Sequence, residues 1–207
     1  MDHSPILKPS PKHITLHSSV VVPDFETGSA ASELQLAHVQ RGRIAIFIDG
    51  SNLFYSALNL GIEIDYLRLL KCLASGDRLL RPYFYTGVDP TNEKQQNFLL
   101  WMRHHGYRVV SKDLVQFANG SKKADLDVEI AVDMMRLVNH YDTAVLVSGD
   151  GNLSYAVNSI SYSGARIEVV SLRSMTSDSL ISVADRYIDL EEIKNEIKKE
   201  EKTIDRI

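Results

Sequence analysis

Two aspartates, Asp49 and Asp150, each stand at or just beyond the end of a run of apolar residues. The runs, residues 44–48 and 144–147, are short and uniformly apolar, which is typical of strands buried on both faces of a sheet. In an open parallel sheet, ligand sites form at the carboxyl ends of the strands, so the two carboxylates can converge there. Converging carboxylates repel each other unless a cation lies between them, and Mg²⁺ is the usual hard cation. The sequence therefore predicts an acidic metal site at one edge of a sheet.

A third carboxylate is expected from the polar connection of residues 112–125, which leads into another helical pattern. Asp127 lies where that helix begins and is the best candidate, with Asp125 next. Asp133 ranks last, because six residues along a helix place it on a different face from Asp127.

Two neutral side chains can support such a site. Asn52 can supply an oxygen or a hydrogen bond that fixes Asp49, and Ser148 can hydrogen-bond a carboxylate from behind the metal. The chemistry of this arrangement is phosphodiester hydrolysis. A carboxylate-bound Mg²⁺ or Mn²⁺ lowers the pKa of a bound water and stabilises the charge that develops on the phosphate, and a second metal can hold the leaving oxygen.

Helix capping is the alternative interpretation of the same residues. Asp, Ser and Asn directly after a strand are ordinary N-caps, and Asp49, Asn52, Asp65 and Asp150 could each be only that. Two strand-end Asp-Gly turns in one sheet favour a site, because capping does not require Asp on both strands. Spacing alone leaves both interpretations open.

Strand and helix patterns alternate along the chain, as the site requires. We expect strands over residues 43–49, 79–86, 107–111, 143–147 and 166–171, and helices over 53–60, 66–74, 92–105, 126–139, 152–163 and 178–184. Such alternation predicts an α/β fold with a mainly parallel sheet and helices on both faces. Right-handed crossovers then place the carboxyl ends of the strands along one edge.

Composition limits the classes of function. The chain has 207 residues, 44% of them hydrophobic, and a formal net charge of -4, so nucleic acid must be met by local basic groups or by metal. The single cysteine excludes an internal disulfide and fits a cytoplasmic protein. We expect neither a signal peptide nor a membrane span, because no apolar run approaches roughly 20 residues.

The domain organisation follows from the same patterns. We expect a flexible leader over residues 1–40, a folded domain over 41–190, and a charged helix or tail over 191–207. Neither a Gly-x-Gly-x-x-Gly loop after the first strand nor a Walker loop is present, which disfavours dinucleotide binding and ATP hydrolysis.

Several side chains could bind nucleic acid beside the acidic site. Lys122, Lys123 and Arg43 could contact backbone phosphates, although a solvated loop explains the lysines equally well. Aromatic side chains near predicted loops could stack on unpaired bases, although such side chains more often belong to the core. They are Tyr55, Phe84, Tyr85 and Phe117.

Three segments in order resemble the NYN domain, and more narrowly the LabA-like branch of the PIN-like nuclease superfamily. They are residues 48–52 (IDGSN), 123–135 (KADLDVEIAVDMM) and 147–152 (VSGDGN). The resemblance implies a PIN-like three-layer sandwich and a metal-dependent ribonuclease-type site. In that site Asp49, Asp127 and Asp150 match the acidic positions, and Asn52 belongs to the first motif.

The sequence departs from the family at Asn152, where the family commonly has a second Asp after Ser-Gly-Asp. An amide oxygen can bind a metal without adding charge, so the site is weakened for a divalent ion. Two hypotheses follow. The first is a ribonuclease acting on single-stranded or structured RNA, with Asp49, Asp127, Asp150 and Asn152 at the metal. The second is a catalytically weak or inactive NYN-fold RNA-binding or regulatory protein. Homodimer formation is left open.

Overall fold

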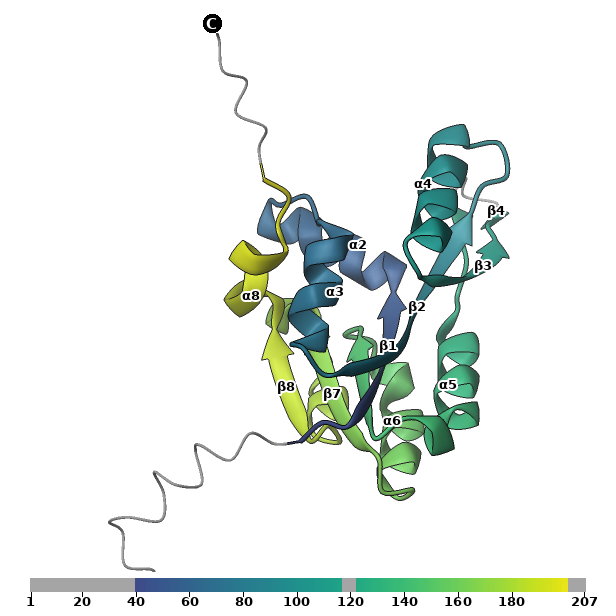
Figure 1. Ribbon diagram of the computed structural model, residues 1–207. Coiled ribbons are helices and arrows are strands. Elements are labelled where there is room, and N and C mark those ends of the chain that lie inside the picture. Colours follow the sequence, from purple (N-terminus) through teal and green to yellow (C-terminus); the bar gives the residue numbers. More distant parts are fainter. Residues whose placement is uncertain (1–39, 117–121, 201–207) are drawn as a thin grey trace, which may run out of the picture. The chain divides into compact units, whose positions relative to one another are not determined.

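The computed structural model in Figure 1 describes residues 40–116 and 122–200. Within these ranges, six strands form one sheet in which every neighbouring pair is parallel. In spatial order they are β3 (Arg108–Asp113), β2 (Arg78–Val88), β1 (Arg43–Asp49), β6 (Thr143–Val147), β7 (Arg166–Ser171) and β8 (Arg186–Asp189). The predicted α/β class with a mainly parallel sheet is confirmed.

The central strand β1 divides its side chains between two cores. Ile44, Ile46 and Ile48 point to one face of the sheet, and Ala45 and Phe47 point to the other. All five are fully buried, as is expected for a strand with helices on both sides. Burial on both faces explains why an unbroken apolar run, rather than an alternating one, forms this strand.

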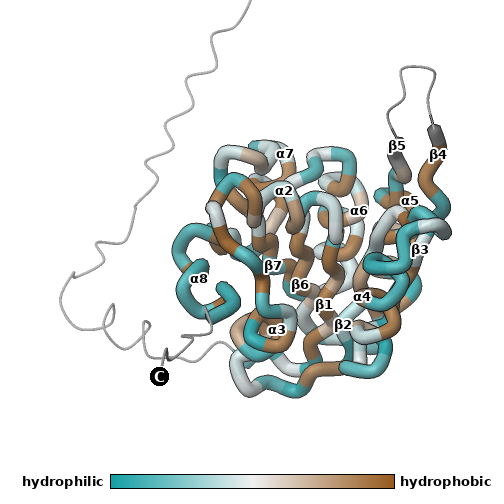
Figure 2. Tube along the Cα trace, turned by 90° about the horizontal axis from the view of Figure 1, so that it is seen from above, coloured by the Kyte–Doolittle hydropathy of each residue, from teal (hydrophilic) through white to brown (hydrophobic). Residues whose placement is uncertain are grey.

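Helices cover both faces, which confirms the predicted three-layer sandwich. One core is closed by α2 (Gly50–Leu60), α3 (Tyr66–Ala74), α4 (Glu93–His104) and α8 (Leu190–Ile197). The other core is closed by α5 (Asp127–Arg136), α6 (Ser154–Ser161) and α7 (Asp178–Ile181). Short 3₁₀ helices are η1 (Val138–His140), η2 (Gly151–Leu153) and η3 (Arg173–Met175). Figure 2 shows the apolar segments gathered on the central strands.

Two features go beyond the predicted elements. The edge strand β8 has an exposed arginine and three half-buried residues, so it lacks the apolar run that marks the inner strands. A small antiparallel pair of strands, β4 (Val115–Gln116) and β5 (Lys122–Lys123), lies within the polar connection of residues 112–125.

None of the described helices is both long and apolar enough to cross a membrane.

The charged segment after residue 190 begins as helix α8 and packs on the core. Leu190 and Ile197 are buried against the same core as α3. The backbone N–H of Asp65 donates to the Ile197 carbonyl at 2.9 Å, which ties α8 to the start of α3. Residues 201–207, and the leader predicted over 1–40 except for its last residue, lie outside the described part of the chain.

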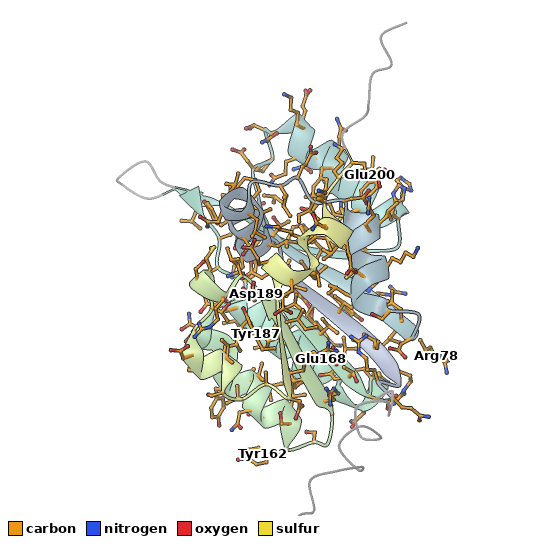
Figure 3. All side chains as sticks on the ribbon, turned by 90° about the vertical axis from the view of Figure 1, so that its left-hand side faces the viewer. Arg78, Tyr162, Glu168, Tyr187, Asp189 and Glu200 are labelled. Atoms are coloured by element: carbon orange, nitrogen blue, oxygen red, sulfur yellow. The ribbon has the colours of Figure 1, made fainter. Side chains whose placement is uncertain are left out.

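Ion pairs hold the amino-terminal edge of the sheet, opposite the strand ends discussed below. Arg43 at the start of β1 pairs with Asp142 at 2.9 Å. The fully buried Glu168 of β7, labelled in Figure 3, accepts from Arg41 at 2.8 Å and Arg166 at 3.1 Å. Pairing with two guanidinium groups satisfies a carboxylate that would otherwise be costly to bury.

Candidate metal centre

Asp49 ends β1 and caps helix α2. Its Oδ1 accepts hydrogen bonds from the backbone N–H of Ser51 at 3.0 Å and of Asn52 at 3.1 Å. The Ser51 hydroxyl donates to the same oxygen at 2.7 Å. The capping role anticipated for this residue is therefore real, and it fixes the carboxylate at the carboxyl edge of the sheet with Oδ2 turned toward β6.

Ser148 joins the ends of β1 and β6. It is fully buried, and its hydroxyl donates to Asp49 Oδ2 at 3.1 Å. The Ser148 Oγ in turn accepts from the backbone N–H of Asp150 at 3.2 Å. One hydroxyl thus sets the position of both strand-end aspartates.

Asn152 extends this network to the third carboxylate. Its backbone N–H donates to Asp150 Oδ1 at 2.9 Å, and its side-chain amide donates to Asp127 Oδ2 at 3.2 Å. Asp127 is the first residue of α5, on the opposite face of the sheet from α2. A continuous chain of hydrogen bonds therefore connects Asp49, Ser148, Asp150, Asn152 and Asp127, although 78 positions separate the first residue from the last.

Two supporting residues, Ser171 and Met175, were not predicted from the sequence. The Ser171 hydroxyl at the end of β7 donates to Asn52 Oδ1 at 3.2 Å. Helix η3 packs so closely on Gly149 that a Cβ there would lie 2.2 Å from the Met175 carbonyl oxygen. Only glycine fits this position, and the close packing holds the turn that presents Asp150.

The electrostatics of Asp127 show that the carboxylates share one field. Partial burial raises the pKa of Asp127, and the charges of Asp150, Asp125 and Asp49 raise it further. The hydrogen bond from Asn152 lowers the pKa of the same carboxyl. A carboxylate whose charge is disfavoured by neighbouring carboxylates lies in a region of negative potential, which attracts a cation.

The donor set fits a hydrated Mg²⁺ or Mn²⁺ better than a cation enclosed by protein. In the described ranges, no three His, Cys, Asp or Glu side chains are grouped so that they could hold a metal ion together. Mg²⁺ usually keeps several waters and binds through one or two carboxylates. The two strand-end carboxylates of Asp49 and Asp150 would supply that number of ligands, and turning the Asn152 amide would present its oxygen.

The remaining predicted residues lie in different places. Asp125 Oδ1 accepts from the backbone N–H of Asp127 at 3.1 Å and so supports the start of α5. Asp133 accepts from the Tyr85 hydroxyl at 3.1 Å and takes no part in the network above. Arg43 is bound to Asp142 at the opposite edge of the sheet. The backbones of Lys122 and Lys123 form β5, and their side chains lie outside the described part of the structure.

The aromatic residues considered for base stacking differ in their exposure to solvent. Phe84 and Tyr85 are buried, with exposed fractions of 3% and 1%, so these two belong to the core, as the alternative had it, and do not stack on bases. Strand β2 continues to Val88 and carries both rings into the core. Tyr55 is exposed, and Phe117 lies outside the described residues.

Comparison with known proteins identifies the family to which the chain belongs. The family model of the NYN domain matches residues 43–191. The low amplitude and bright protein LabA of Synechococcus elongatus is 38% identical over 169 residues, which cover 77% of this chain and 90% of that protein. The crystal structure of a protein of unknown function, VPA0982 from Vibrio parahaemolyticus, has a TM-score of 0.67 at 26% identity. It covers 78% of this chain and 98% of its own. The chain therefore belongs to the NYN domain family, as a LabA-like member.

Proposed function

We propose that this protein is a metal-dependent endoribonuclease that hydrolyses RNA phosphodiester bonds at the Asp49–Asp127–Asp150 edge. The family is PIN-like and nuclease-type, its nucleases generally use divalent metals, and RNA is its expected substrate or partner. The observation that carries the proposal is the hydrogen-bond chain that links these three carboxylates across two strand ends and a helix. Capping alone explains Asp49 and Asp150 but does not explain Asp127.

Each residue has a distinct role in this proposal. Asp49 and Asp150 bind the cation from the strand ends, and Asp127 binds it from the opposite side. Ser148 and Asn52 hold Asp49 and the neighbouring helix in place. A bound Mg²⁺ or Mn²⁺ supplies a water of lowered pKa and stabilises negative charge on the phosphate.

Asn152 favours a second candidate function, a weak or inactive site that still binds RNA. Its amide N–H donates to Asp127 Oδ2 and takes up a lone pair that a metal would use. The side chain also lacks the charge of the aspartate that is common in the family. A protein of this kind binds RNA or a regulatory partner without metal-dependent turnover.

Cleavage of a labelled single-stranded RNA with Mg²⁺ or Mn²⁺ tests the proposal. Asp49→Asn and Asp150→Asn should each lower the cleavage rate by roughly 100-fold or more, as is usual when a charge-stabilising group is removed. Asp178→Asn is the matched control, because it removes an exposed carboxylate of α7 that is paired with Arg173. Equal rates in wild type and Asp49→Asn would refute the proposal. Binding of RNA without EDTA-sensitive cleavage would favour the second function.

The compartment and the oligomeric state of the protein are further predictions. We propose the cytoplasm as the compartment, because the single cysteine fits a reducing environment. Homodimer formation also stays a prediction, and sedimentation equilibrium of the purified chain decides it.

A further inference from the structure

Three exposed aromatic rings lie on the two helices that begin at the candidate metal centre. In the described part of the chain, the aromatic side chains with large exposed surface number five. They are Phe54, Tyr55, Trp101, Tyr155 and Tyr162. Three of the five stand five or six residues after a strand-end aspartate: Phe54 and Tyr55 after Asp49, and Tyr155 after Asp150.

Helix α2 turns two of these rings away from the core. Leu53 and Ala57 are buried, whereas Phe54 is 55% and Tyr55 57% exposed. Their rings contact each other edge to face, with centroids 5.5 Å apart. A helix rises 1.5 Å per residue, so Phe54 lies roughly 7 Å along the axis from Asp49. A phosphate at Asp49 and a neighbouring base on these rings are therefore within reach of one RNA strand.

Helix α6 presents the third ring on the other face of the sheet. The Ser154 hydroxyl donates to the Gly151 carbonyl at 2.7 Å and fixes the start of the helix. Tyr155, the next residue, is 83% exposed. Because α2 and α6 pack on opposite faces, the rings flank the carboxylates from two sides. Packing does not account for rings that leave most of their area in water.

We propose that these rings bind single-stranded RNA, with bases stacked on Phe54–Tyr55 on one side of the carboxylates and on Tyr155 on the other. This inference rests on the proposed function and specifies its substrate class. Stacking needs unpaired bases, which a duplex keeps inside its helix. A chain of net charge -4 has little bulk attraction for phosphate, so stacking supplies much of the affinity.

The experiment compares leucine variants, which keep the apolar bulk and the helix propensity but remove the aromatic face. Binding of a short fluorescein-labelled RNA of mixed sequence is measured by anisotropy, with Ca²⁺ in place of Mg²⁺. The same strand annealed to its complement is measured in parallel. Phe54→Leu/Tyr55→Leu and Tyr155→Leu should each weaken single-strand binding roughly ten-fold. Tyr155→Trp should restore it.

Tyr162→Leu is the matched control. Tyr162 is 85% exposed just past the end of α6, and in Figure 3 it lies far from Asp189 at the carboxyl end of β8. Its variant should bind RNA as wild type does. Loss of affinity in all the leucine variants, or equal binding of duplex RNA, would overturn the inference. A change of sedimentation mass with unchanged RNA affinity would assign the rings to a protein interface and also overturn it.

The two proposals fail in different ways. If wild type binds no RNA and cleaves none, the proposed function itself fails. If wild type cleaves RNA and Asp49→Asn does not, but the Phe54, Tyr55 and Tyr155 variants bind as tightly as Tyr162→Leu, only the stacking inference fails.

Discussion

Asn152 is the residue at which this protein departs from the common pattern of its family. The side-chain amide donates a hydrogen bond to Asp127 and lowers the pKa of that carboxyl. A donor in this position relieves the repulsion among the carboxylates, and thus stabilises the metal-free site. An aspartate would add repulsion in the metal-free state and attraction for a dication in the bound state.

Asn152→Asp should therefore bind Mn²⁺ more tightly than wild type, by roughly ten-fold, because a ligand charge replaces a neutral amide. Isothermal titration calorimetry measures the change. Asn139→Asp adds the same charge on the exposed η1, beside the amino end of β6, and should leave the affinity unchanged. Unchanged or weaker Mn²⁺ binding in Asn152→Asp would show that residue 152 faces away from the ion.

At the scale of residues, the sequence predicts positions better than contacts. Asp49 and Asp150 stand at strand ends, as expected, because apolar runs mark buried strands. Ser171 could not be predicted, since its partner Asn52 is 119 positions away. Phe84 and Tyr85 lie inside the predicted strand of residues 79–86, and whether their rings face the core or solvent depends on helices packed from elsewhere in the chain.

Among the elements, the turn between β6 and α6 is positioned by close packing of backbone. The Gly149 carbonyl accepts from the Ser177 N–H at 3.0 Å, and η3 covers the position where a Cβ would stand. The rigidity of this turn places Asp150 relative to Asp49.

Gly149→Ala should lower the free energy of unfolding by about 3 kcal/mol, because backbone and not a flexible side chain must move. Gly164→Ala is the control. Gly164 has φ +83° with open space around it, so alanine there suffers only backbone strain of about 1 kcal/mol. Urea denaturation of both variants measures the difference, and equal losses would contradict the packing argument.

Elements with an apolar run were predictable, and short or partly buried ones were not. Strands β6 and β7 match their predicted ranges because both are wholly or almost wholly buried. Strand β8 escaped prediction because its residues are only partly buried, and the short β4–β5 hairpin has too few residues for a periodicity. The segment after residue 190 was expected as a charged helix or tail, and the burial of Leu190 and Ile197 depends on contacts with the distant α3.

Across the whole molecule, the two edges of the sheet have opposite electrostatic characters. The carboxyl edge gathers negative charge, whereas charge pairs close the amino edge. There the Arg43 guanidinium hydrogen-bonds Asp142 and lowers the pKa of that carboxyl to about 2. Because the pKa of Asp142 is lower in the folded protein than in the unfolded chain, its ionised form stabilises the fold at pH values above the unfolded-state pKa.

This stabilisation should disappear as the pH falls from about 4, the unfolded value, to about 2. Asp142→Asn should lower the melting temperature at neutral pH by about 1 to 3 °C, since the pair is solvent-exposed. The difference in melting temperature between Asp142→Asn and wild type should disappear at pH values below the pKa of Asp142 in the folded protein. Thermal melts across pH measure this, with Arg43→Gln as the partner control. Parallel curves for wild type and Asp142→Asn would contradict the assignment.

The number of phosphates that basic side chains contact sets how RNA binding depends on salt, and a chain of net charge -4 is expected to contact few. If few phosphates are contacted, log K against log salt concentration should have a slope of about −2 on single-stranded RNA. Anisotropy titrations over a range of NaCl concentrations measure it. A slope of about −5 or steeper would mean a broad basic surface, against the account of metal and stacking.

The most direct test of the central claim counts Mn²⁺ bound to the purified protein, using electron paramagnetic resonance of the free ion. We expect saturable binding in wild type and in Asp178→Asn, and its loss in Asp49→Asn, Asp127→Asn and Asp150→Asn alike. Binding that survives all three substitutions would show that these carboxylates do not share an ion, and the proposed nuclease centre would be wrong.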